Sequence, residues 1–190
     1  MTEPCPFCLC SQGQHLYNCK VLQKVPLVNT DTLIVTFSDE NYRFLSNFHP
    51  SEVFLNNNTE RYKTVEHAYQ AAKSSDPETR KLFQDPYITP GKAKILGTNI
   101  HPIRKDWEDV KLEIMEYLLL QKFKPGSELG ILLEEKTKGK MIVEGNHWHD
   151  TFWGKCFCSN HLGEGQNKLG YLLMKIRDGI IQVIDSLEDC

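Results

Sequence analysis

Residues 64–73 read Thr64-Val65-Glu66-His67-Ala68-Tyr69-Gln70-Ala71-Ala72-Lys73. Threonine is a preferred helix N-cap because its hydroxyl accepts a hydrogen bond from a backbone N–H group of the first turn, so Thr64 predicts the start of a helix. Tyr69 follows Glu66 by three positions and Lys73 follows it by seven, which places the three side chains on one helix face. The tyrosine and alanines among these charged groups favour the wall of a pocket over a fully solvated face.

Further elements are predicted on both sides of this helix. Residues 33–37 and 52–55 have the β-branched and aromatic content of buried strands, and the second run ends at the turn signal Asn56-Asn57-Asn58. Downstream, Asp76-Pro77 and Thr89-Pro90 are each a capping residue followed by proline at the first helical position. Two more helices are therefore predicted to begin at these dipeptides.

The second half of the chain predicts two long helices and a third strand. After Asp106, apolar side chains recur at helical intervals until the stop signal Pro125-Gly126. These apolar residues are Trp107, Val110, Ile114 and Leu118. Residues 141–144 are a plausible strand, and a helix with a wide apolar face begins near residue 167. The pattern predicts a mainly helical α+β domain with a few short strands.

Composition and charge limit the classes of function that the chain can have. A chain of 190 residues that is 40% hydrophobic can bury one full core. The net charge of −3, from 22 basic and 25 acidic residues, provides no global field that would hold nucleic acid, so any such contact must be local. The chain has no long apolar run, and cysteines and polar residues stand where a signal peptide would need cationic and then apolar ones. We expect a soluble cytoplasmic or nuclear protein without a membrane partner.

Seven cysteines, an odd number, fit metal ligands or free thiols better than a disulfide framework. Cys5, Cys8, His15 and Cys19 have a spacing that can supply three thiolates and one imidazole to a tetrahedral structural zinc. A segment this short would need the metal for its folding energy. It resembles a zinc knuckle of nucleic-acid-binding proteins, and the alternative is a disordered tail with reactive thiols.

Cys156, Cys158 and His161 form a second Cys/His group. They could build a metal site of their own or complete one with the N-terminal cysteines, but the spacing favours chance proximity within a loop. The chain is predicted to comprise a zinc-knuckle-like segment (1–22), a linker (23–32) and one folded domain (33–186).

Five ordered segments combine charged, amide and indole groups with apolar residues. Besides residues 64–73 they are Phe44-Leu45-Ser46-Asn47-Phe48, Arg104-Lys105-Asp106-Trp107, Asp150-Thr151-Phe152-Trp153-Gly154 and Gly165-Gln166-Asn167-Lys168-Leu169-Gly170. This series, which spans residues 33–181, resembles the NADAR superfamily, also called YbiA-like proteins. The resemblance implies a single compact YbiA-like domain without an organic cofactor. The family is associated with hydrolysis of N-glycosidic bonds in riboflavin-pathway intermediates or ADP-ribosylated bases, so the implied partner is a ribosylated nucleotide or an ADP-ribosyl small molecule.

Cleavage of an N-glycoside passes through an oxocarbenium-like sugar and needs a carboxylate, a proton source and a positioned water. Glu66 is the predicted carboxylate. Asp150 could orient the water or donate the proton, and its alternative role is that of a turn former. Lys73 has two open roles. It could attack the anomeric carbon and form a Schiff base, or it could stay charged and hold a phosphate.

Other residues of the five segments are predicted to contact the substrate. The predicted contacts are Asn47, Phe48, Tyr69, Arg104, Trp107, Trp153, Gly154 and Asn167. Four of them have an ordinary alternative role. Trp107 lies on the apolar stripe of its helix, Arg104 could be a surface cation, Asn167 could cap the last helix, and Asn47 could stabilise a turn with its own side chain. Trp153 could stack on a planar leaving group, and Gly154 would let the backbone approach a ligand closely.

The second functional hypothesis is a binding module that recognises ADP-ribose or an NAD derivative without turnover. The zinc knuckle would tether this module to nucleic acid. In such a reader the charged groups Glu66, Lys73 and Asp150 would have no reason to persist together. Their presence favours the enzyme, an N-glycosidase.

Overall fold

Helix α1 (Val65–Ala71) begins as the sequence predicts, in a computed structural model that describes residues 33–34, 37 and 39–188. The Thr64 hydroxyl accepts a hydrogen bond from the His67 backbone N–H at 3.3 Å. The Asn47 carbonyl accepts a second one from the backbone N–H of Glu66 at 3.0 Å. All seven residues of α1 are buried, so its polar side chains lie inside the protein. The predicted zinc-knuckle-like segment and the linker lie outside the described residues.

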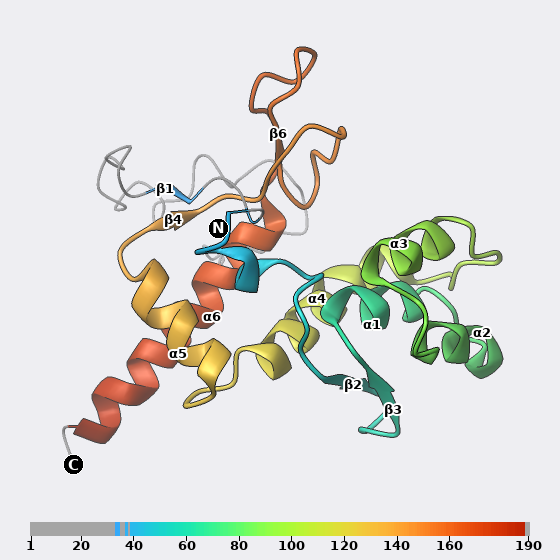
Figure 1. The fold of residues 1–190 in the computed structure, drawn as a ribbon, viewed down its shortest axis with the longest axis horizontal. Coiled ribbons are helices and arrows are strands. Elements are labelled where there is room, and N and C mark those ends of the chain that lie inside the picture. Colours follow the sequence, from blue (N-terminus) through green and yellow to red (C-terminus); the bar gives the residue numbers. More distant parts are fainter. Residues whose placement is uncertain (1–32, 35–36, 38, 189–190) are drawn as a thin grey trace, which may run out of the picture.

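Helices α2 (Pro77–Lys81) and α3 (Pro90–Thr98) begin at the two predicted capping dipeptides. Asp76 accepts hydrogen bonds from two backbone N–H groups of α2, and Thr89 accepts one from the N–H of Lys92. A short 3-10 helix, η4 (Leu82–Gln84), follows α2 directly. These elements pack around α1 (Figure 1).

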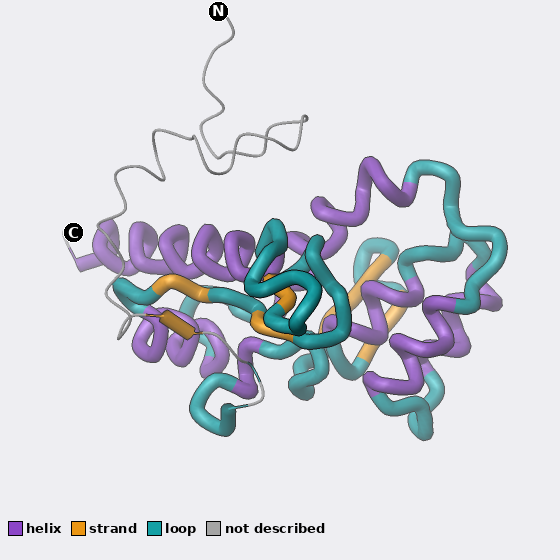
Figure 2. Tube along the Cα trace, turned by 90° about the horizontal axis from the view of Figure 1, so that it is seen from above, coloured by secondary structure: helices purple, strands orange, loops and turns teal. Residues whose placement is uncertain are grey.

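Helix α4 (Trp107–Lys122) joins two groups of elements, because it contacts α1 on one side and α6 (Lys168–Glu188) on the other. Helix α5 (Glu128–Thr137) packs beside α6 at the end of the molecule opposite α2 and α3 (Figure 1). Figure 2 shows α6 as a long helix along one edge. Asp106 precedes α4 as predicted, but its side chain makes no capping hydrogen bond.

The strands of the described residues are short and form three two-stranded sheets. The parallel pairs are β1 (Leu33–Ile34) with β4 (Met141–Ile142) and β5 (Gly145–Asn146) with β6 (Lys155–Cys156). The antiparallel pair is β2 (Val53–Leu55) with β3 (Glu60–Tyr62), and a 3-10 helix, η3 (Arg43–Leu45), precedes it. The predicted turn between β2 and β3 is present, since Asn56, Asn57 and Asn58 all have positive φ.

One hydrophobic core joins these elements. Trp107 and Leu118 of the predicted α4 stripe are buried in it, and Val110 and Ile114 pack against it from partly buried positions. Leu173 of α6 and Leu133 of α5 are fully buried in the same core. The prediction of a mainly helical α+β domain is confirmed. In the described part of the chain, no helix is long and apolar enough to cross a bilayer.

Candidate active site

A cavity of about 740 Å³ lies where α1, α3, α4 and the chain from Glu144 to Phe157 meet. This volume is typical of a pocket for a small organic ligand. Eight of the predicted site residues line the cavity: Asn47, Phe48, Glu66, Tyr69, Lys73, Trp107, Asp150 and Trp153. Arg104, Gly154 and Asn167 are not among its lining residues. The predicted zinc ligands Cys5, Cys8, His15 and Cys19 lie outside the described residues.

Glu66 is a buried carboxylate at the wall of this cavity, with only 6% of its surface exposed. Its Oε1 accepts a hydrogen bond of 2.8 Å from Gln70 Nε2, one helical turn further along α1. Burial raises the pKa of Glu66 above its ordinary value, while the Gln70 hydrogen bond and the charges of Lys94 and Lys73 act in the opposite direction. Glu66 therefore has two cations that favour its ionised form.

Glu144 is a second carboxylate in the cavity, and the sequence analysis did not select it. Burial raises its pKa to about 7, and the charges of Asp150 and Glu66 act in the same direction. Gly154 allows this packing, because a Cβ atom there would lie 2.1 Å from the Glu144 carbonyl oxygen and 2.4 Å from its Oε2. One sequence signal could have identified Glu144: it is a charged residue at the end of an apolar strand.

Three lysines face the cavity, of which the sequence predicted only Lys73. Desolvation lowers the pKa of Lys73, although Glu66 partly offsets this effect, and its Nζ donates a hydrogen bond of 3.2 Å to the Gly97 carbonyl. The other two are Lys94 of α3 and Lys111 of α4. Lys111 is ion-paired with Glu108, whereas Lys94 is exposed and positioned to meet an anionic group of a ligand.

Aromatic rings make up another wall. The ring centroids of Tyr69 and Trp107 are 5.0 Å apart, and those of Tyr69 and Trp153 are 5.5 Å apart with the planes at 89°. Trp107 is 8% exposed and belongs to the core as well as to the cavity wall. The two roles weighed for this residue are thus compatible.

Asp150 lies on the cavity and also forms a turn. Its Oδ1 accepts hydrogen bonds from the backbone N–H groups of Phe152 at 3.1 Å and Trp153 at 2.9 Å. Asn146 braces the same turn, because its Nδ2 donates to the Asp150 carbonyl at 2.8 Å. The turn-forming role of Asp150 is therefore present, and it orients the Trp153 backbone.

Arg104 and Asn167 have other partners than a ligand. Arg104 makes a bidentate ion pair with Asp106, at 2.6 and 2.8 Å, outside the cavity. The Asn167 amide is buried: its Oδ1 accepts from the Glu144 backbone N–H and its Nδ2 donates to the Ile142 carbonyl, both at 2.9 Å. Asn167 thus supports the backbone that carries Glu144, and neither predicted substrate contact is brought into the cavity.

A buried lysine donates a hydrogen bond to the loop that carries Asn47. Lys122 is 3% exposed, and its Nζ donates a hydrogen bond of 2.7 Å to the Ser46 carbonyl. Burial lowers the pKa of Lys122 to about 7. This contact positions Asn47 at the cavity, and the sequence analysis did not predict it.

Three buried side-chain oxygens have no hydrogen-bond partner within the described part of the protein: Asn47 Oδ1, Gln70 Oε1 and Glu144 Oε2. All three belong to residues that line the cavity. Buried acceptors are normally paired, and unpaired ones that converge on one space indicate a polar ligand. The fold and the cavity thus define a small α+β protein with a pocket lined by aromatic rings, unpaired polar atoms and two carboxylates.

Comparison with known proteins places this chain in a family. Residues 36–181 match the model of the NADAR domain, and the chain belongs to the NADAR family. It is 34% identical to the N-glycosidase YbiA of Shigella flexneri serotype 5b, over 82% of this chain and 93% of that protein. It is 32% identical to the riboflavin biosynthesis protein PYRR of Zea mays, over 73% of this chain and 23% of that protein.

A solved structure is similar as well. The NMR structure of YbiA from E. coli matches with a TM-score of 0.65 and 32% identity, over 87% of this chain and 94% of that one. This match confirms the predicted YbiA-like fold.

Proposed function

We propose that this protein is an N-glycosidase that hydrolyses the bond between an anomeric carbon and a base or amine nitrogen. The observation that carries the proposal is a pair of carboxylates, the buried Glu66 and the partly buried Glu144, which face one cavity and have raised pKa values. N-glycoside hydrolysis needs one carboxylate to stabilise a sugar cation and one acid to protonate the leaving nitrogen. Relatives named N-glycosidase support the same activity.

The environments of the two carboxylates suggest their roles. Two cations, Lys94 and Lys73, favour the ionised form of Glu66 against one anion, Asp150. For Glu144 the balance is reversed, since Asp150 and Glu66 favour its neutral form against Lys94 alone. In the proposed reaction Glu144 donates its proton to the leaving nitrogen as the bond to the anomeric carbon breaks. Ionised Glu66 stabilises the oxocarbenium-like sugar. Water then adds to the anomeric carbon, and its released proton restores Glu144, which yields the free base and the sugar hydroxyl.

The proposed substrate is a ribosylated nucleotide, either a riboflavin-pathway intermediate or an ADP-ribosylated guanine. The Tyr69, Trp107 and Trp153 rings would contact its planar base, and stacking of this kind contributes about 1–3 kcal/mol per base. Lys94 is positioned to hold its phosphate, whereas the guanidinium of Arg104 is paired with Asp106 and the ammonium of Lys111 with Glu108. Asn47 and Phe48 would complete the contacts from the opposite loop.

The test is release of a free base. Incubation with ribosylated pyrimidine amines, ADP-ribosylated guanine and ADP-ribose should release a base or amine from at least one substrate, measured by mass spectrometry. In 18O-labelled water the label should appear on the sugar. Tight binding to one of these ligands with no release from any of them would contradict the proposal and favour the non-catalytic binding module.

Lys73 separates two versions of the mechanism. In the Schiff-base version its neutral amine attacks the anomeric carbon, the base departs, the ring opens to an imine, and water hydrolyses the imine. Borohydride added during turnover should then reduce the imine to a stable sugar adduct on Lys73, and Lys73→Arg should be inactive. Desolvation of Lys73, which lowers its pKa, supports this version.

The control is Lys92→Arg, which alters an exposed lysine of α3 that does not line the cavity. It should react and trap as the wild type does. An active Lys73→Arg variant together with an unmodified Lys73 after borohydride treatment would assign Lys73 to phosphate binding and leave the oxocarbenium version.

The N-terminal segment would add a separate function to this domain. Cys5, Cys8, His15 and Cys19 are proposed to bind one structural zinc, and the knuckle so formed would contact nucleic acid locally. The spacing of the four ligands supports this proposal.

A further inference from the structure

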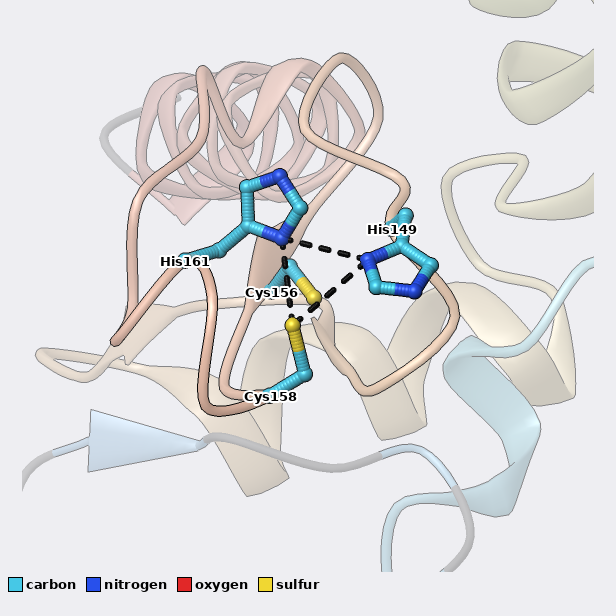
Figure 3. A group of neighbouring side chains, drawn as sticks. All are labelled: His149, Cys156, Cys158 and His161. Atoms are coloured by element: carbon cyan, nitrogen blue, oxygen red, sulfur yellow. Dashed lines mark hydrogen bonds between the residues drawn. The ribbon is translucent and has the colours of Figure 1, made fainter.

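Four metal-binding side chains converge in the loops around β6. They are His149, Cys156, Cys158 and His161, and Figure 3 shows their ligand atoms facing a common centre. All four ligand atoms lie within 4.8 Å of one another. Cys156 ends β6 and is buried, whereas the other three extend from the loops on either side.

The three separations among His149, Cys158 and His161 are close to the edges of a tetrahedral metal site. His149 Nδ1 and His161 Nδ1 are 3.2 Å apart, and Cys158 Sγ lies 3.1 Å from His161 Nδ1 and 3.5 Å from His149 Nδ1. Bonds of about 2.3 Å to sulfur and about 2.0–2.1 Å to nitrogen at tetrahedral angles give ligand separations of roughly 3.3–3.8 Å. The separations to Cys156 Sγ are at most 4.8 Å, so a shift of about 1 Å or less would bring the fourth atom within the same range.

Hydrogen bonds alone account poorly for this arrangement. His149 Nδ1, His161 Nδ1 and Cys158 Sγ make three mutual contacts. Each ring nitrogen carries either a proton or a lone pair, so all three contacts can be hydrogen bonds only if two of them share one proton. A cation at the centre would instead be faced by a lone pair of each atom.

Hydrogen bonds hold the two loops in shape around the cluster. His149 has φ of 67° and Leu162, next to His161, has φ of 48°. Asn146 Oδ1 accepts from the backbone N–H groups of Trp148 and Asp150, on either side of His149, and the Cys158 carbonyl accepts from that of Leu162. Burial of apolar side chains adds little here, because Trp148 is 58% exposed and Leu162 is 81% exposed.

We propose that His149, Cys156, Cys158 and His161 bind one structural zinc ion. Two thiolates and two imidazoles in a tetrahedron are a donor set that suits zinc. Four protein ligands close the coordination shell and leave no position for a water or substrate, so the ion would not act in catalysis.

The proposed ion would hold one wall of the cavity in place. Trp148 and Asp150 flank His149, and Phe157 lies between the two cysteines, and all three residues line the cavity. A cation that joins the loop after β5 to the loop after β6 would fix these side chains together. It would take the place of the hydrophobic core that these exposed loops lack.

Three of these ligands, Cys156, Cys158 and His161, were grouped from the sequence. Chance proximity was favoured for them over a metal site of their own or one completed with the N-terminal cysteines. The missing ligand is His149, which follows β5 and reaches the group only because β5 and β6 pair in parallel. The loop site is therefore complete within the described residues and independent of the proposed N-terminal one.

Zinc content of the full chain tests the proposal, with the two sites separated by mutation. The background carries Cys5→Ser and Cys8→Ser, which remove two of the N-terminal thiols. In this background we expect one zinc per chain by inductively coupled plasma mass spectrometry. Adding Cys158→Ser should abolish stoichiometric zinc, whereas adding Ser159→Ala, an exposed neighbour outside the cluster, should retain it.

Two further measurements do not depend on the folding of the Cys158→Ser variant. X-ray absorption of the zinc in the Cys5→Ser, Cys8→Ser background should show two sulfurs at about 2.3 Å and two nitrogens at about 2.0–2.1 Å. Chelation should accelerate amide hydrogen exchange in residues 147–164 more than in α1 and α4. A folded background protein without stoichiometric zinc, or a bound zinc with three or four sulfurs, would overturn the proposal.

Discussion

Glu66→Gln should lower kcat by about two to three orders of magnitude while substrate binding and the fold are retained. Glutamine has nearly the same shape and can still accept the hydrogen bond from Gln70 Nε2, so the local packing is preserved. What is lost is the negative charge that stabilises the sugar cation, and this charge acts mainly in the transition state. A hundredfold loss corresponds to about 2.7 kcal/mol of transition-state stabilisation. Steady-state kinetics and thermal unfolding of the variant provide the measurement.

Glu135→Gln is the matched control, because it removes the same charge from an exposed position on α5, and it should leave the kinetics unchanged. Activity of Glu66→Gln within severalfold of the wild type would remove Glu66 from the mechanism. A parallel fall in substrate affinity and melting temperature would instead assign it a structural role.

Glu144→Gln should lower kcat/KM by about two to four orders of magnitude, as expected when a general acid is removed. The pKa of Glu144 is raised to about 7, so in the wild type the protonated acid predominates below pH 7 and is lost above it. The wild-type kcat/KM should therefore decline above about pH 7, and this decline should disappear in the variant. A variant that keeps both the rate and the alkaline decline would exclude Glu144 as the acid.

The stability of the same variant provides an internal control. Because the pKa of Glu144 is higher in the folded protein than its ordinary value of 4.5, the folded state binds the extra proton between about pH 4.5 and pH 7. Wild-type stability is therefore lost as pH rises through this window. Glu144→Gln carries no such cost, and it should be at least as stable as the wild type at pH 8. A loss of activity in a variant of undiminished stability is then a chemical effect.

The local elements of this fold could be predicted from the order of residues along the chain. Thr64, Asp76 and Thr89 begin helices as predicted, because a cap depends on one side chain and the N–H groups two or three residues away. The apolar face of α4 could also be predicted, since helical periodicity depends on residues that are close together along the chain. The family motifs likewise indicated Glu66, Lys73 and the aromatic residues that line the cavity.

Tertiary structure alone decided which distant residues join them. Glu144 and Lys94 enter the cavity because the chain after β4 and helix α3 both pack towards α1. Arg104 stays outside because Asp106 pairs with it, and Asn167 turns to the backbone of the strand segment beside it. His149 meets the cysteines only through the pairing of β5 with β6. Caps and periodicity act over a few residues, whereas burial, charge coupling and metal geometry depend on distances that exist only after the chain has folded.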